Sequence, residues 1–89
     1  MTEKTATTTR PTVMCFSGHD PTGGAGITAD IEAISSQGCH ASSIITSLTV
    51  QDSVDVYSLF PIDADIIVQS ARAVLEDMPV AAFKLGLLG

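Results

Sequence analysis

Hydrophobic residues in the first half of the chain follow strand-like spacing first and helix-like spacing next. Residues 12–17 (TVMCFS) form a short apolar, β-prone run that predicts a first strand. After a glycine-rich stretch, Ile27, Ile31 and Ile34 recur at i, i+4 and i+7, which predicts a helix with one apolar stripe. We expect this helix to cover about residues 25–37, because a glycine that can end it comes next.

The second half of the chain repeats this alternation. Residues 42–50 (SSIITSLTV) are apolar on both faces in the middle of the run, which indicates a buried parallel strand. A shorter alternating run at 54–60 predicts an edge strand that Pro61 ends. A helix is expected over residues 63–77 with an aspartate as its N-cap, and residues 80–85 (VAAFKL) predict a last strand.

The order of these elements predicts an α/β fold with right-handed crossovers and a mostly parallel sheet. Two helices can hardly cover both faces of three or four strands. We therefore expect residues 12–89 to be the N-terminal portion of a larger domain, preceded by a disordered tail at residues 1–11.

Composition narrows the functional classes. The net charge is −6 with four basic residues, which argues against binding to nucleic acid or to an anionic membrane. No run of about 18 apolar residues predicts a membrane span. Cys15 and Cys39 form no CxxC pair and have no histidine at metal-ligand spacing, so we expect reduced thiols, no metal site and a cytoplasmic location.

The glycine-rich stretch FSGHDPTGGAG (residues 16–26) is the first candidate for chemistry. Gly18 and Gly23 have the spacing of a P-loop, but no lysine follows, so the P-loop interpretation fails. A dinucleotide fingerprint is weak here, because extra residues separate the glycines from the strand and Gln51 replaces the expected acidic residue. Two interpretations stay open, namely an ordinary turn or a loop whose bare N–H groups meet a ligand.

Three further polar residues have two interpretations each. Asp30 lies on the border of the apolar stripe, either solvated or placed beneath the loop to accept hydrogen bonds from an amine or hydroxyl. Gln51 ends the second strand, where open α/β sheets bind ligands, although such a residue is more often part of a loop. Lys84 either extends to solvent from an edge strand or serves a site. No Ser-His-Asp or Cys-His arrangement is readable.

Residues 17–53 and 83–89 (FKLGLLG) resemble the hydroxymethylpyrimidine/phosphomethylpyrimidine kinases, the thiamine-pathway members of the ribokinase-like superfamily. The likeness rests on DPTGGAG after the first strand, on Ala29-Asp30 in the helix, on a Thr-x-Gln-Asp segment and on Lys-Leu-Gly-Leu. It implies a three-layer α/β/α fold. It also implies ATP-dependent phosphorylation of 4-amino-5-hydroxymethyl-2-methylpyrimidine and of its monophosphate.

The resemblance also implies roles for single residues. The residues that would bind the pyrimidine are Gly18, Asp30, Gln51 and Leu87, and the loop residues near it are His19, Asp20, Gly23 and Gly24. Leu87 stands where many relatives have methionine, and the position of His19 is often Ser or Thr.

In this family, the catalytic anion hole and the site for ATP and Mg²⁺ lie near the C-terminus, beyond residue 89. Residues 1–89 alone are therefore expected to be inactive, and a homodimer is compatible with the resemblance. The alternatives are a pyridoxal-type kinase of the same superfamily and a non-catalytic pyrimidine-binding fragment.

Overall fold

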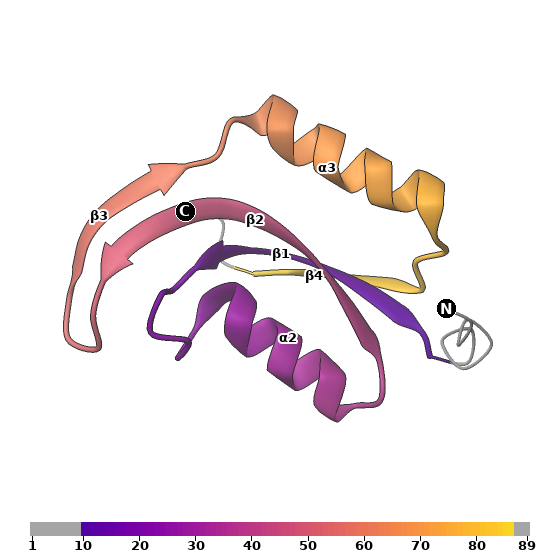
Figure 1. Cartoon of the computed structure of the whole chain (residues 1–89), viewed down its shortest axis with the longest axis horizontal. Helices are drawn as coiled ribbons and strands as arrows, with labels where there is room; N and C mark the ends of the chain where they lie inside the picture. The colour runs from indigo at the N-terminus through magenta and orange to yellow at the C-terminus, as the bar shows by residue number, and fades with distance from the viewer. Residues whose placement is uncertain (1–9, 87–89) are drawn as a thin grey trace.

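The computed structural model describes residues 10–86. Strands and helices alternate along this part of the chain (Figure 1). In chain order the elements are β1 (Thr12–His19), α2 (Gly26–Ser36), β2 (His40–Gln51), β3 (Val56–Pro61), α3 (Ala64–Asp77) and β4 (Ala82–Leu85). The prediction of strand, helix, two strands, helix and strand is confirmed.

The strands form a single sheet in the order β3-β2-β1-β4. β1 is parallel to both β2 and β4, whereas β3 is antiparallel to β2 and lies at the edge. α2 covers one face of the sheet and α3 lies over the other, so the described residues form three layers (Figure 1). The predicted α/β class, the mostly parallel sheet and the edge position of β3 are confirmed.

Some predicted boundaries are wrong by one or two residues. β1 continues to His19 instead of ending at Ser17, because its pairing with β2 resumes after a bulge and joins His19 to Leu48. β2 begins at His40 and β4 begins at Ala82. Pro61 belongs to β3 instead of stopping the strand before it. A proline is tolerated there because an edge strand needs hydrogen bonds on one side only.

The first described residues pair with the start of β2. Arg10 donates from its guanidinium to the carbonyl oxygen of Cys39 over 2.8 Å. The N–H of His40 donates to the carbonyl oxygen of Pro11, also over 2.8 Å. Residues 10 and 11, which we assigned to the tail, are thus attached to the sheet, and residues 1–9 lie outside the described part.

The core is small and lies mainly between α2 and β1. Cys15, Ile27 and Ile34 form its buried cluster, and Val13 and Ala41 pack against it. Ile31 is 37% exposed, so the predicted stripe is wrong at this position. The face of α2 that meets the sheet consists of Ile27, Asp30 and Ile34, and Asp30 is therefore buried.

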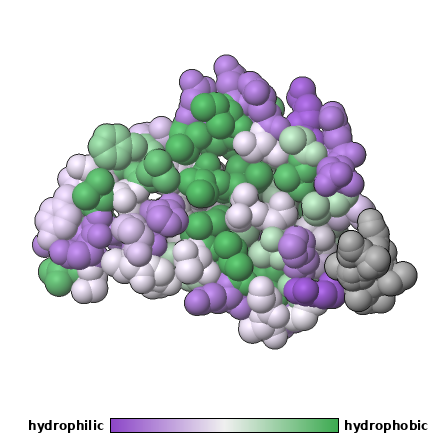
Figure 2. Space-filling view, viewed as in Figure 1, coloured by the Kyte–Doolittle hydropathy of each residue, from purple (hydrophilic) through white to green (hydrophobic). Residues whose placement is uncertain are grey.

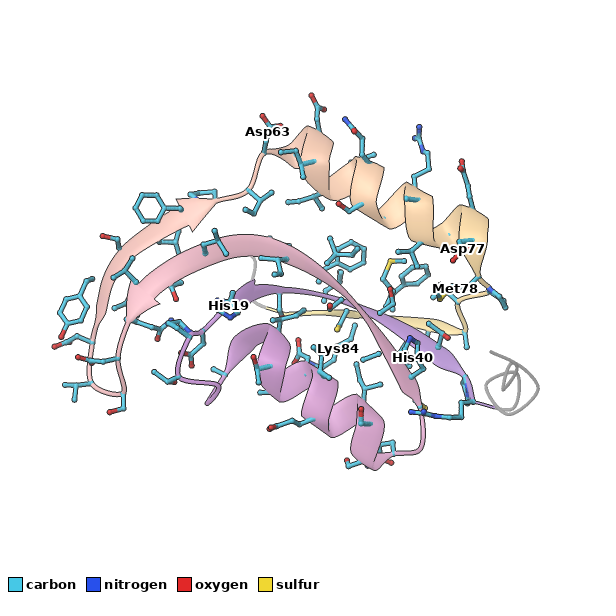
Figure 3. The ribbon with its side chains drawn as sticks, in the orientation of Figure 1. His19, His40, Asp63, Asp77, Met78 and Lys84 are labelled. Atoms are coloured by element: carbon cyan, nitrogen blue, oxygen red, sulfur yellow. The ribbon has the colours of Figure 1, made fainter. Side chains whose placement is uncertain are left out.

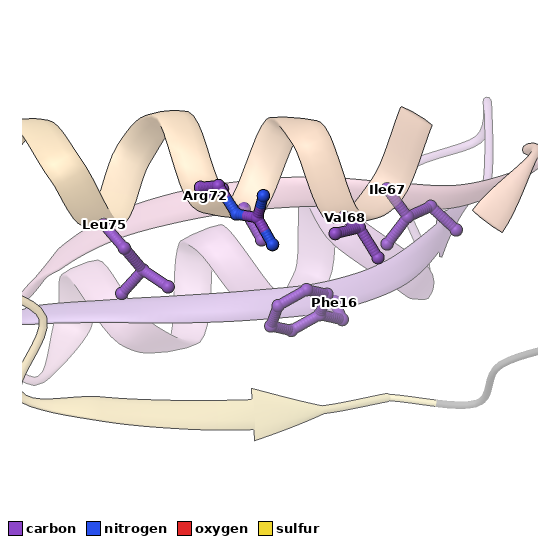
Figure 4. Close-up of a pocket in the computed structure, with 6 residues that line it drawn as sticks. Phe16, Ile67, Val68, Arg72 and Leu75 are labelled. Carbon is purple, nitrogen blue, oxygen red and sulfur yellow. The ribbon is translucent and has the colours of Figure 1, made fainter. Parts of the chain in front are cut away.

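α3 packs less closely than α2. The carboxylate of Asp63 accepts the N–H of Asp65 over 2.9 Å, which confirms the predicted N-cap. None of the helix residues is buried. An apolar cavity of about 360 Å³ lies between Phe16 of β1 and the helix residues Ile67, Val68, Ala71, Arg72 and Leu75 (Figure 4).

Apolar surface gathers between α3 and the sheet (Figure 2). Val68, Leu75 and Phe83 are among the large apolar side chains left about half exposed there. Within residues 10–86, no helix has the length and apolar character needed to cross a membrane.

Candidate functional site

The C-terminal ends of β1 and β2 lie next to each other and lead into the glycine-rich loop. The register pairs Gly18 with Ser47 and His19 with Leu48. A Cβ atom at Gly18 would lie 2.6 Å from the buried Ser47 hydroxyl oxygen, so the Ser47 side chain leaves no room for a side chain at this position. Gly26, at φ +65°, is equally restricted, because a Cβ there would collide with the Gly18 carbonyl oxygen. The glycines thus bring the loop back against the end of β1.

The loop closes on itself around Asp20. The Asp20 carboxylate accepts the N–H of Thr22 over 2.9 Å and its hydroxyl over 2.8 Å. These two hydrogen bonds are the main reason that the pKa of Asp20 lies below its usual value. The N–H of Gly23 donates to the Asp20 carbonyl over 3.0 Å, and the N–H of Gly24 donates to the Thr22 hydroxyl over 3.3 Å.

These bonds change the interpretation of the loop. We considered bare N–H groups available to a ligand, but the N–H groups of Thr22, Gly23 and Gly24 are used inside the turn. The turn chemistry of the DPTGG segment is therefore confirmed, whereas a phosphate cradle from these N–H groups is not. Contact of Asp20, Gly23 and Gly24 with a substrate stays a prediction.

Asp30 is the charged centre of the site. Its residue exposure is 9%, and it faces β1 and β4 from the second turn of α2. Ser17 of β1 donates its hydroxyl to Asp30 Oδ2 over 2.6 Å. Lys84 of β4 donates its ammonium to Asp30 Oδ1 over 2.7 Å and forms an ion pair with it. The long side chain of Lys84 thus extends from β4 toward α2 (Figure 3).

The protonation state of Asp30 depends on effects that shift its pKa in opposite directions. Burial alone raises the pKa of its carboxyl group. The hydrogen bonds from Lys84 and Ser17, together with the positive charge of Lys84, outweigh burial and lower the pKa below its usual value. Asp30 is therefore an anion at neutral pH, and the interpretation as a solvated helix carboxylate is wrong.

Gln51 lies at the end of β2 and is connected to β1 through Thr49. Its amide nitrogen donates to the Thr49 hydroxyl, which donates in turn to the carbonyl oxygen of His19 over 2.8 Å. This chain of hydrogen bonds joins the C-terminal ends of the two parallel strands. It leaves the amide oxygen of Gln51 without a hydrogen bond within residues 10–86.

The C-terminal end of β4 lies at the same end of the sheet as those of β1 and β2. Gly86 follows β4, and its N–H donates to the Phe16 carbonyl oxygen over 2.8 Å. A Cβ at Gly86 would collide with the Ser17 hydroxyl, so a glycine is needed where the chain passes β1. Leu87, the remaining residue predicted to bind the pyrimidine, lies outside the described residues.

Sequence reasoning missed one residue and left another undecided. Ser17 was not singled out, although a serine next to the glycine loop inside an apolar strand was a usable signal. Lys84 had two interpretations; its ammonium pairs with Asp30, and its service in a site stays a prediction. Within residues 10–86 no group of three or more His, Cys, Asp or Glu side chains could hold a metal ion.

Comparisons with known proteins identify the family of the chain. Residues 20–89 match the phosphomethylpyrimidine kinase family. The hydroxymethylpyrimidine/phosphomethylpyrimidine kinase of Aquifex aeolicus is 37% identical over 84% of this chain and 29% of its own length. The hydroxymethylpyrimidine/phosphomethylpyrimidine kinase THI20 of Saccharomyces cerevisiae is 40% identical over 88% of this chain and 14% of its own length.

Solved structures give the same result. A phosphomethylpyrimidine kinase from Clostridium difficile has a TM-score of 0.81 and 36% identity, covering 90% of this chain and 34% of that one. A Bacillus subtilis pyridoxal kinase, solved as an ADP complex, has a TM-score of 0.79 and 27% identity, covering 89% and 31%. The chain spans about a third or less of these proteins. The match over residues 20–89 and the identity to these kinases show that the chain belongs to the phosphomethylpyrimidine kinase family.

Proposed function

We propose that the full-length protein transfers phosphate from ATP to 4-amino-5-hydroxymethyl-2-methylpyrimidine and then to its monophosphate. In this proposal the present chain supplies one wall of the pyrimidine pocket. The observation that carries it is the buried, ionised Asp30 at the C-terminal ends of β1 and β4, held by Ser17 and Lys84. Ligands of open α/β sheets bind at that end of the strands.

The residues around Asp30 suit an aminopyrimidine. A carboxylate offers about four lone-pair positions, of which Ser17 and Lys84 occupy two. The remaining positions accept hydrogen bonds from the amino group of the ring. The amide of Gln51 both donates and accepts, which suits a ring nitrogen beside an amino group. The family resemblance adds Gly18 and Leu87 to this assignment, and Leu87 lies outside the described residues.

The binding of ATP and Mg²⁺ is assigned to other parts of the protein. Residues 10–86 hold no metal-ligand cluster, and the N–H groups at the centre of the loop are bonded within it. The N–H groups of Thr22, Gly23 and Gly24 are therefore not free to hold a phosphate group of ATP. We assign the nucleotide, the metal ion and the catalytic anion hole to parts of the protein outside residues 10–86. A homodimer and a cytoplasmic location also stay predictions.

A pyridoxal kinase is the second candidate. The likeness to the pyridoxal kinase of Bacillus subtilis, at a TM-score of 0.79, favours it. Pyridoxal has a similar ring with a hydroxymethyl group, but it carries a ring hydroxyl instead of an amino group. An anionic acceptor therefore suits the aminopyrimidine better.

Steady-state kinetics of the full-length protein distinguish the two candidates. We expect kcat/KM for the hydroxymethylpyrimidine to exceed that for pyridoxal by about tenfold or more, because one hydrogen bond to a charged group is at stake. ATP and Mg²⁺ are held constant in both assays. A clear preference for pyridoxal would overturn the proposed substrate.

A further inference from the structure

Lys84 is the side chain whose part in the site is not explained by the sequence pattern. It lies on β4, next to Cys15 of β1, and reaches across to Asp30 of α2. Its side chain is 48% exposed, whereas that of Asp30 is 12% exposed. The pair thus joins a buried acceptor to an accessible cation, and it connects two elements that do not otherwise meet.

We propose that Lys84 is a positioning residue of the pyrimidine site, which fixes the Asp30 carboxylate against β1 as an acceptor for the amino group of an uncharged aminopyrimidine. This inference rests on the proposed function. Two opposing partners hold the carboxylate, Lys84 at Oδ1 and Ser17 at Oδ2, so its plane cannot turn freely. The orientation of its free lone pairs is therefore set before a ligand arrives.

The ion pair also sets the charge that a ligand meets. A buried carboxylate without a partner takes up a proton itself and loses its charge as an acceptor. With Lys84 beside it, Asp30 keeps its acceptor capacity while the pair carries no net charge. A neutral aminopyrimidine is thus preferred to its protonated form.

The titratable side chains against Asp30 in the described part of the chain are Lys84 of β4 and Cys15 of β1. Burial, followed by the charge of Asp30, raises the pKa of the Cys15 thiol above its usual value. Cys15 is therefore neutral below pH 8 and adds no titration in the range tested. When Lys84 is removed, the hydrogen bond from the Ser17 hydroxyl is the remaining interaction that lowers the pKa of Asp30 against the effect of burial. The pKa of Asp30 must therefore rise.

The test compares the full-length protein with Lys84→Met between pH 5.5 and 8, measuring KM for the hydroxymethylpyrimidine and kcat. The ratio of the two KM values at each pH cancels the titration of the substrate itself. We expect this ratio to grow by about tenfold as the pH falls, because protonation removes the charged acceptor. The value of kcat should change less than KM, and Lys84→Arg should restore a flat ratio.

A second readout does not depend on the pyrimidine. The ¹³C resonance of the Asp30 carboxyl group is titrated in the wild type, Lys84→Met and Lys84→Gln, and we expect higher pKa values for Asp30 in both variants. If the pyrimidine fails to bind to the wild type, the proposed substrate is wrong, while the titration still judges the role of Lys84. An unchanged Asp30 titration, or a KM ratio that is the same at every pH, would overturn the positioning role.

Discussion

Gly18 shows at the scale of one residue why the site needs a glycine. Its backbone has no positive φ, so conformational freedom does not explain it. The reason is space, because a Cβ atom would lie 2.6 Å from the hydroxyl oxygen of Ser47, which is 3% exposed. The packing of the Ser47 hydroxyl against the C-terminal end of β1 therefore depends on this residue.

Replacing this glycine tests the explanation. We expect Gly18→Ala to lower the free energy of unfolding of the full-length protein by about 1–3 kcal/mol, the usual cost of overpacking. Adding Ser47→Ala should recover most of the loss, since it removes the colliding oxygen. Gly24→Ala is the matched control, because the nearest atom to its Cβ is 3.5 Å away. Urea denaturation measures all four proteins, and a double variant no more stable than Gly18→Ala would contradict the account.

Single residues also mark where sequence reasoning ends. The spacing of Ile27 and Ile34 correctly gave the inner face of α2, but Ile31 is exposed and Asp30, expected at the border of the stripe, is buried. Helical spacing places both near the stripe, so it does not tell which of the two faces the sheet. Asp30 can be buried only because Ser17 and Lys84, 13 and 54 positions away, supply partners. Contacts at that separation leave no pattern in the local sequence.

At the scale of elements, the signals at the ends of the helices were the most reliable. The Asp63 N-cap and the glycine after α2 appear where they were predicted, because caps depend on a few neighbouring residues. The direction of β3 was not predictable with the same rules. A short loop around Asp52 reverses the chain there, held by hydrogen bonds to Val54, Asp55 and Tyr57.

The cap of α3 provides a prediction at this scale. We expect Asp63→Ala to reduce the free energy of unfolding of the full-length protein by about 1 kcal/mol, because the N–H of Asp65 loses its acceptor. Asp77→Ala is the control, since this aspartate lies at the C-terminal end of the helix, where a negative charge is unfavourable. Guanidinium denaturation compares the two, and equal effects would mean that the cap contributes nothing.

At the scale of the whole molecule, the parallel arrangement brings the proposed site together. Gly18, Gln51 and Lys84 lie toward the C-terminal ends of the parallel strands β1, β2 and β4. Asp30 reaches them from α2, on the face of the sheet that this helix covers. The fold class and the mostly parallel sheet followed from the alternation of elements, because a βαβ unit has one favoured hand. The loose packing of α3 over the cavity beside Phe16 was not visible in its amphipathic sequence.

The most direct test of the pyrimidine wall is the effect of Asp30→Asn on the two substrates of the full-length protein. We expect KM for the hydroxymethylpyrimidine to rise by about tenfold or more, with a smaller change in KM for ATP, because the charged acceptor serves the pyrimidine alone. Asp77→Asn, an exposed aspartate of α3, is the matched control, and circular dichroism checks that each variant is folded. Equal increases in both KM values, or no change in the KM for the pyrimidine, would contradict the account.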